Sequence, residues 1–101
     1  MQLAIIAGTL VHDAESLTDA KGTNFLRFTV KCKSKDKKDR IITNLYTCYC
    51  YIKNTTPPKE GDKVFLSGKL SLGIQYDDDN NPYPHATIVV TSMDRGEINK
   101  R

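Results

Sequence analysis

The sequence has no tryptophan, only three cysteines, and no apolar stretch that approaches the roughly 18 residues needed to cross a membrane as a helix. An odd number of cysteines argues against the disulfide framework of a small secreted protein. The apolar start, residues 1–8, lacks the basic region and the long hydrophobic segment of a signal peptide. These absences predict a cytoplasmic protein that does not contact a membrane.

Patterns typical of enzymes and metal sites are missing as well. The sequence offers no serine–histidine–acid arrangement, no glycine-rich phosphate loop and no zinc motif. Cys48 and Cys50 could ligate a metal, but only His12 and His85 could complete a four-ligand site, and neither stands at a ligand-like spacing. The aspartates at 77–79 lack the glycine and the distal glutamate of a calcium loop. We therefore predict no catalytic residues, no metal and no cofactor.

The length and the charge distribution limit what kind of partner to expect. With 101 residues, the chain is expected to form one domain over residues 1–95, followed by a short flexible basic tail at 96–101. The formal net charge is +3, and residues 31–40 hold six cations against two acids, so the rest of the chain is about neutral. This cluster has two interpretations, the electrostatic footprint of a polyanion partner or a solvated hairpin tip.

Alternating apolar and polar residues predict strands along most of the chain. We expect five strands, at 3–11, 23–33, 40–52, 62–72 and 86–93, with long loops after the first, second and fourth. Gly8 and Gly68 suit the sharp bends of a small barrel, whereas Pro57 and Pro58 preclude a helix between the third and fourth strands. The predicted fold class is all-β, a five-stranded OB-fold barrel, with an SH3-like barrel as the main competitor.

The second and third strands separate core-like residues from outward-facing ones. In the second strand, Leu26, Phe28 and Val30 share one face, and the residues between them share the other. In the third strand, Cys48 and Cys50 are expected to be buried as small hydrophobic residues, which turns the neighbouring tyrosines outward. The outward face then carries these aromatic and basic side chains: Phe25, Arg27, Lys31, Lys33, Tyr49 and Tyr51.

Three motifs, in the same order and at similar spacing, relate the chain to a known family. The first is the strand at 3–10, which ends in Gly-Thr-Leu. The second is Gly22-Thr23 followed by Arg-Phe-Thr-Val at 27–30, and the third is the run Glu-Gly-Asp-Lys-Val-Phe-Leu-Ser-Gly-Lys-Leu at 60–70. Together they resemble the bacterial single-stranded DNA-binding protein family and span most of residues 3–93.

The chain also departs from that family. It has no counterpart of the family's helix between strands three and four, of its DNA-stacking tryptophans, or of its flexible linker with an acidic tip. In these respects it looks more like primosomal OB proteins, or like single-strand binders carried by phages and mobile elements.

The resemblance implies a binding face over strands two and three, where aromatic rings stack on bases and cations follow the phosphates. Tyr76 is included because it lies near the family's strand-four aromatic residue. Tyr49 and Tyr51 have a second interpretation, as cover for the barrel surface or for an oligomer interface. The candidate nucleic-acid-binding residues are Phe25, Arg27, Lys31, Lys33, Lys35, Lys37, Lys38, Tyr49, Tyr51 and Tyr76.

The function expected from these features is sequence-independent binding of single-stranded DNA in replication, recombination or mobile-element maintenance. Two alternatives stay open: a primosome-like OB subunit whose main partner is a replication protein, and an RNA-binding OB domain. Leu3, Ile5 and Ile6 make the first strand apolar on both faces, and the resemblance places a subunit contact near that strand. We therefore expect a homodimer or a homotetramer formed partly through it.

Overall fold

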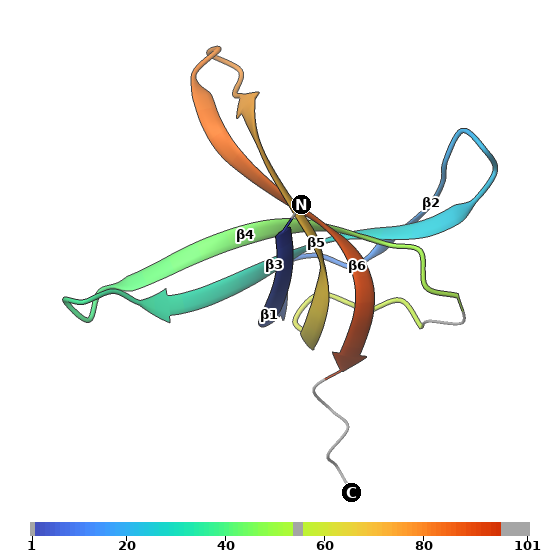
Figure 1. The fold of residues 1–101 in the computed structure, drawn as a ribbon, viewed down its shortest axis with the longest axis horizontal. Helices are drawn as coiled ribbons and strands as arrows, with labels where there is room; N and C mark the ends of the chain where they lie inside the picture. Colours follow the sequence, from blue (N-terminus) through green and yellow to red (C-terminus); the bar gives the residue numbers. More distant parts are fainter. Residues whose placement is uncertain (1, 54–55, 96–101) are drawn as a thin grey trace, which may run out of the picture.

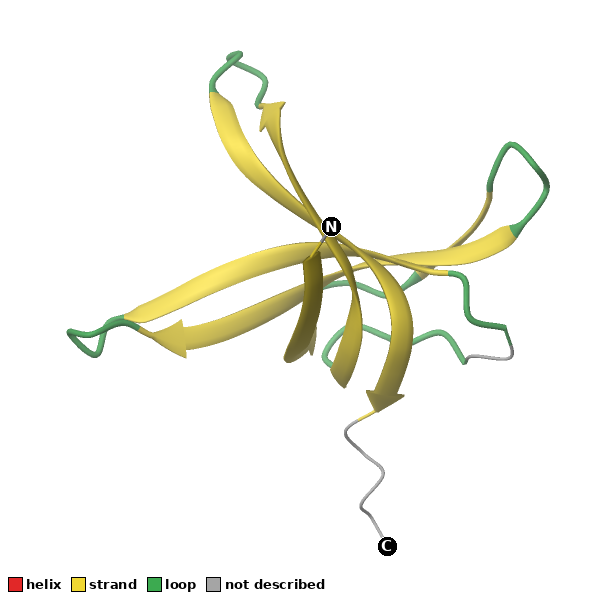
Figure 2. Cartoon of the chain, in the orientation of Figure 1, coloured by secondary structure: helices red, strands yellow, loops and turns green. Residues whose placement is uncertain are grey.

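The computed structural model describes residues 2–53 and 56–95, and every regular element in them is a β-strand (Figure 2). The strands form one sheet in the order β1-β5-β6-β4-β3-β2. Pairing of β1 with β3 at Thr9 and Leu10 closes five of them into a barrel and leaves β2 on its edge. The bounds are β1 (Gln2–Leu10), β2 (Glu15–Thr18), β3 (Asn24–Lys35), β4 (Ile41–Cys50), β5 (Lys63–Tyr76) and β6 (Pro82–Arg95).

The closed five-stranded barrel predicted from the sequence is thus confirmed, and its core is where the alternation places it. Cys48 and Cys50 are 0% and 1% exposed, so the tyrosine between them points away from the core. Cys32 is only partly buried and packs against the core from the side. The buried apolar residues are Leu10, Leu26, Phe28, Val30, Cys48, Cys50, Val64, Leu66, Ile88 and Val90.

Two glycines make the closure of the barrel sterically possible. At Gly8 a Cβ atom would lie 2.7 Å from Val30 Cγ1 and 2.9 Å from the Cys32 sulfur, because β1 crosses closely over β3 there. At Gly68 a Cβ would lie 2.8 Å from Ile88 Cγ2, next to a bulge in the β5–β6 pairing. The bends predicted at these two glycines are therefore present, and larger side chains would force the strands apart.

Three hairpin turns share one local design, in which an aspartate opens a five-residue turn. Asp19, Asp36 and Asp77 each accept the backbone N–H groups of the residues two and four positions later, at 2.8–2.9 Å. At Asp36 these bonds hold the carboxyl pKa below its usual value. The fourth residue of each turn has a positive φ and is Gly22, Asp39 or Asn80, residue types that tolerate this conformation.

The strands differ from the predicted ones in two places, each next to one of these turns. The segment between the first and second predicted strands was expected to be a polar loop, but it contains β2. The predicted loop at 73–84 is largely strand, because Gly73 pairs with His85 and Tyr76 with Pro82. The hydrogen-bonded ladder continues until the Asp77 turn reverses the chain, so the loops expected to be long are paired hairpins with short turns.

Two of the hairpins project from the barrel as twisted ribbons that diverge from one another (Figure 1). The basic ribbon, residues 31–45 of β3 and β4, carries six cations against two acids. The acidic ribbon, residues 71–87 of β5 and β6, carries three aspartates and no lysine or arginine. The two ribbons thus carry formal charges of opposite sign.

The connection between β4 and β5 contains no helix at 51–53 or 56–62, as the two prolines predict. Pro58 is buried, and its carbonyl accepts the backbone N–H of Ala14 at 2.9 Å, so the connection is fixed against the segment before β2. Over the described residues, no helix is long and apolar enough to span a membrane. The tail expected at 96–101 lies outside the described residues.

Candidate nucleic-acid interface

The outer face of β3 and β4 carries an aromatic cluster, which consists of Phe25, Tyr49 and Tyr51. β3 and β4 pair with Leu26 opposite Cys50, so the residues on either side face outward together. The rings of Phe25 and Tyr51 are stacked, with centroids 5.0 Å apart and planes 23° apart. Tyr49 is tilted against Phe25 at 6.0 Å. Tyr51 is 41% exposed, so the cluster offers aromatic surface to a ligand.

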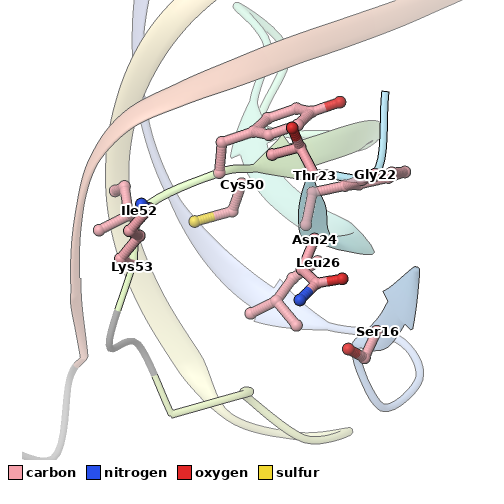
Figure 3. Close-up of a pocket in the computed structure, with 10 residues that line it drawn as sticks. Ser16, Gly22, Thr23, Asn24, Leu26, Cys50, Ile52 and Lys53 are labelled. Atoms are coloured by element: carbon pink, nitrogen blue, oxygen red, sulfur yellow. The ribbon is translucent and has the colours of Figure 1, made fainter. Parts of the chain in front are cut away.

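A pocket of about 570 Å³ adjoins this cluster, between the β2–β3 turn and the end of β4. The core residues Leu26 and Cys50 line it, and Asn24 and Ser16 contribute polar groups (Figure 3). Its size falls in the range of small-ligand sites. The described residues around it are Ser16, Gly22, Thr23, Asn24, Phe25, Leu26, Cys50, Tyr51, Ile52 and Lys53.

A row of lysines continues from the aromatic cluster along the same face of β3. Lys31, Lys33 and Lys35 alternate with Cys32 and Ser34 on the opposite face, and they lie opposite Leu45, Thr43 and Ile41 of β4. Lys31 is half-buried, whereas Lys33 and Lys35 are exposed. Two further candidates, Lys37 and Lys38, are exposed in the turn at the tip of the basic ribbon.

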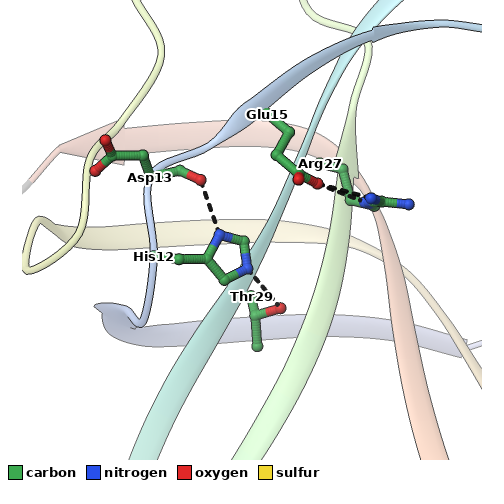
Figure 4. A network of polar contacts seen from close by, with 5 residues as sticks. All are labelled: His12, Asp13, Glu15, Arg27 and Thr29. Atoms are coloured by element: carbon green, nitrogen blue, oxygen red, sulfur yellow. Dashed lines mark hydrogen bonds and ion pairs between the residues drawn. The ribbon is translucent and has the colours of Figure 1, made fainter.

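Arg27, which faces Tyr49 of the aromatic cluster, is held by a carboxylate. Its Nε and Nη2 both donate to Glu15 Oε1, at 3.0 Å and 2.7 Å, across the β2–β3 pairing (Figure 4). The hydrogen bond and the charge of Glu15 raise the pKa of Arg27 above its usual value. Glu15 was missed from the sequence because its position depends on β2, for which four residues give little periodic signal.

Next to this ion pair, the segment before β2 covers the same strand. His12 Nδ1 donates to the carbonyl oxygen of Asp13 at 2.8 Å, and its Nε2 lies 3.3 Å from Thr29 Oγ1 (Figure 4). Thr29 stands between Arg27 and Lys31 on the outer face of β3. His12 and Glu15 therefore form the edge of the candidate interface.

Tyr76 is not brought to this face. It lies at the end of β5 on the acidic ribbon, is 64% exposed, and shares one face of the strand with Leu72 and Ile74. By strand parity these residues continue the core-facing side of β5, which begins with Val64 and Leu66. Nine of the ten candidates lie on β3, on the basic turn or around the outer face of β4, and Tyr76 is separate from them.

Among the described residues, no group of three or more histidine, cysteine or acidic side chains is placed to hold a metal ion. The three thiols are free, and burial raises the pKa of Cys48 to about 12. Such thiols are protonated at neutral pH and are poor nucleophiles. The β3–β4 face itself carries aromatic rings and cations, which can stack on flat ligands and pair with anions.

Comparison with solved structures identifies the architecture. The chain is similar to the small single-stranded DNA-binding protein from Streptomyces coelicolor, with a TM-score of 0.74 and 15% sequence identity over 93% of each chain. The chain has an OB fold. The Plasmodium falciparum single-stranded DNA-binding protein, solved in complex with single-stranded DNA, is also similar, with a TM-score of 0.68, 12% identity, and 94% of this chain and 92% of that one covered.

At these identities the likeness concerns the fold. No family model matches the sequence, and no curated protein matches it. The OB-fold prediction, and the resemblance to single-stranded DNA-binding proteins as far as it concerns fold, are confirmed. What this particular OB barrel binds has to be argued from its own side chains.

Proposed function

We propose that this protein is a non-catalytic, sequence-independent binder of single-stranded DNA. The observation that carries the proposal is the outward-facing aromatic cluster of Phe25, Tyr49 and Tyr51. It is followed along the same face by Lys31, Lys33 and Lys35 of β3. Stacking accepts any base, and lysines track phosphates without reading sequence. Single-strand binding on OB folds combines these two elements.

The geometry supports a path for the strand. From Phe25 to Lys35 the outer face of β3 extends for roughly 33 Å at about 3.3 Å per residue. Bases would stack at the Phe25 end, beside the pocket, and the backbone would run toward the basic turn. The path avoids the acidic ribbon, where three aspartates and no lysine or arginine would repel phosphates. The proposed path therefore does not include Tyr76.

The comparisons support the same class of ligand, since one similar structure was solved in complex with single-stranded DNA. Within that class we propose a cytoplasmic role in DNA replication, recombination or mobile-element maintenance. RNA is the nearest competing ligand, because stacking and phosphate contacts do not by themselves distinguish the two nucleic acids.

A second candidate function, an interaction subunit for a replication protein, is favoured by the acidic ribbon. Leu72, Ile74 and Tyr76 are 70%, 66% and 64% exposed along one of its faces. Contiguous exposed apolar residues are typical of protein contacts. This candidate would be preferred if single-strand binding were weak while a complex with a helicase or primase was tight.

We also propose that the protein assembles as a homodimer, or as a tetramer of two such dimers, partly through β1. On the side of β1 away from β5, the described pairing with β3 involves only Thr9 and Leu10. Leu3 and Ile5 on the outer face of β1 are 78% and 70% exposed. An open strand edge with apolar side chains is suited to pairing with another strand.

Light scattering tests this assembly. At tens of micromolar the wild-type protein should be at least a dimer, and Ile5→Lys should shift it to a monomer. A wild-type monomer would contradict the proposal.

The experiment that tests the proposed function is a titration of labelled oligo(dT), followed by fluorescence anisotropy at two salt concentrations. The logarithm of the binding constant should fall linearly with the logarithm of the salt concentration. Duplex DNA of equal length should compete poorly for the protein. Matched RNA as competitor separates the RNA alternative. Equal or better competition by duplex DNA would overturn the proposal.

A further inference from the structure

The ion pair between Glu15 and Arg27 stands in the path proposed for the DNA backbone. The guanidinium lies on the outer face of β3, between the aromatic cluster and Lys31, where a phosphate would have to pass. Both of its bonds end on one carboxylate oxygen of Glu15, at 3.0 Å and 2.7 Å. A carboxylate presents to arginine the same kind of acceptor oxygens as a phosphate. Glu15 thus occupies the position that a ligand oxygen would take.

The pair is accessible enough to exchange. The side chains of Arg27 and Glu15 are 45% and 50% exposed, so an incoming phosphate can reach the guanidinium without unfolding the barrel. Exposed ion pairs of this kind hold weakly, because water and salt screen them. Arg27 also faces Tyr49 across the β3–β4 register, so its position is fixed from the side of the aromatic cluster as well.

We propose that Glu15 is an affinity-setting residue that occupies Arg27 in the free protein and is displaced by a phosphate when single-stranded DNA binds. The inference rests on the proposed function. It adds that β2 has a role in binding, although it contributes no cation and no aromatic ring to the face. Binding at Arg27 exchanges one anion for another, so it releases fewer counterions than binding at a free arginine.

The exchange has a second consequence. Once displaced, the Glu15 carboxylate lies beside the phosphate that replaced it, and two like charges at that distance repel. Glu15 therefore lowers the affinity of the complex and speeds its dissociation. A protein that must later give up its strand benefits from such a residue, because release then does not require the lysine contacts to be weak.

The test compares four proteins: wild type, Glu15→Gln, Arg27→Gln and the double variant. Oligo(dT) affinity is measured between about 50 and 200 mM salt, the range over which counterion release is resolved. Glu15→Gln should tighten binding several-fold at low salt and steepen the log–log salt slope by about 0.7, the value for one additional phosphate contact on a single strand. Arg27→Gln should weaken binding more in the Glu15→Gln background than in wild type.

Asp78→Asn is the matched control, since it removes one negative charge from the tip of the acidic ribbon, away from β3. It should leave the slope unchanged. In wild-type protein, the Arg27 Nε–H resonance should shift as oligo(dT) is added, a measurement that needs no variant. An unchanged slope in Glu15→Gln, or equal costs of Arg27→Gln in both backgrounds, would overturn this inference while leaving the proposed function intact. Failure of wild type to bind oligo(dT) would overturn both.

Discussion

Phe25 of β3 stacks on Tyr51, the residue just after β4, with the two rings 5.0 Å apart and nearly parallel. The contact joins two outward-facing side chains that are distant in sequence, and it is created by the register that buries Cys50 opposite Leu26. Each ring therefore limits the motion of the other. A base that stacks on this pair meets a surface that is already ordered, which lowers the entropic cost of binding.

The first prediction concerns these two rings. Phe25→Ala and Tyr51→Ala should each weaken oligo(dT) binding by about 1–3 kcal/mol, the usual range for base stacking. The double variant should lose less than the sum, because removal of one ring already disorders the other. Tyr76→Ala, on the acidic ribbon and outside the proposed path, is the control and should bind as wild type does. Strictly additive losses would show that the rings act independently.

The second prediction concerns the lysine row. Lys31→Gln and Lys33→Gln should each reduce the slope of log affinity against log salt by about 0.7, since each removes one phosphate contact. Their effect should nearly vanish at high salt, whereas the loss in Tyr51→Ala should persist there. Lys59→Gln, in the connection before β5, is the control of equal charge change. Equal salt slopes in all three variants would show that the lysine row does not contact the DNA.

The third prediction concerns the closure of the barrel. Gly8→Ala places a Cβ against the Lys31 carbonyl and the Val30 side chain, so it should lower the free energy of unfolding by about 1–3 kcal/mol or more. For a domain of this size, each kcal/mol corresponds to a fall in Tm of roughly 4–8 °C. Gly73→Ala, which meets nothing within 4 Å, should change stability by less than about 0.5 kcal/mol. Similar Tm values for the two variants would show that β1 does not cross β3 as closely as described.

The fourth prediction concerns pH. Burial raises the pKa of the Cys48 thiol from 9.0 to about 12. The folded state therefore favours the protonated thiol, and this contribution to stability is complete below pH 9 and declines as the pH rises from 9 toward 12. The decline should approach about 1.4 kcal/mol per pH unit for this group. Because lysines and tyrosines titrate in the same range, the measurement is the difference between wild type and Cys48→Ala in urea unfolding. If that difference did not depend on pH, the Cys48 thiol would have its ordinary pKa and would be exposed to water.

The parts of the fold that follow from period-two alternation could be predicted from the sequence. Leu26, Phe28 and Val30 are buried because every second residue of a strand faces the same side, and Cys48 and Cys50 follow the same rule on β4. Gly8 and Gly68 could be interpreted as bends because a strand interior otherwise disfavours glycine. These are local regularities, visible in one segment at a time.

What could not be predicted depends on pairing between segments. β2 has a single apolar residue of note, Leu17, and becomes a strand only because β3 is beside it. The acidic ribbon has exposed faces and aspartates typical of a loop, yet its backbone ladder continues to Tyr76 and Pro82. The Glu15–Arg27 pair and the separation of Tyr76 from the aromatic cluster are consequences of these pairings. Sequence alone therefore identified most of the proposed interface, but neither the residue that competes with its ligand nor which candidate lies elsewhere.

The central claim is that single-stranded DNA crosses the outer face of β3 and β4, over Phe25, Tyr49 and Tyr51. Ultraviolet cross-linking of wild-type protein to oligo(dT), followed by mass spectrometry of the linked peptides, tests it without any substitution. We expect cross-links at these three residues, and their loss when unlabelled oligo(dT) competes. Cross-links confined to Tyr76 and Tyr83 under saturating DNA would contradict the account, because the strand would then run along the acidic ribbon.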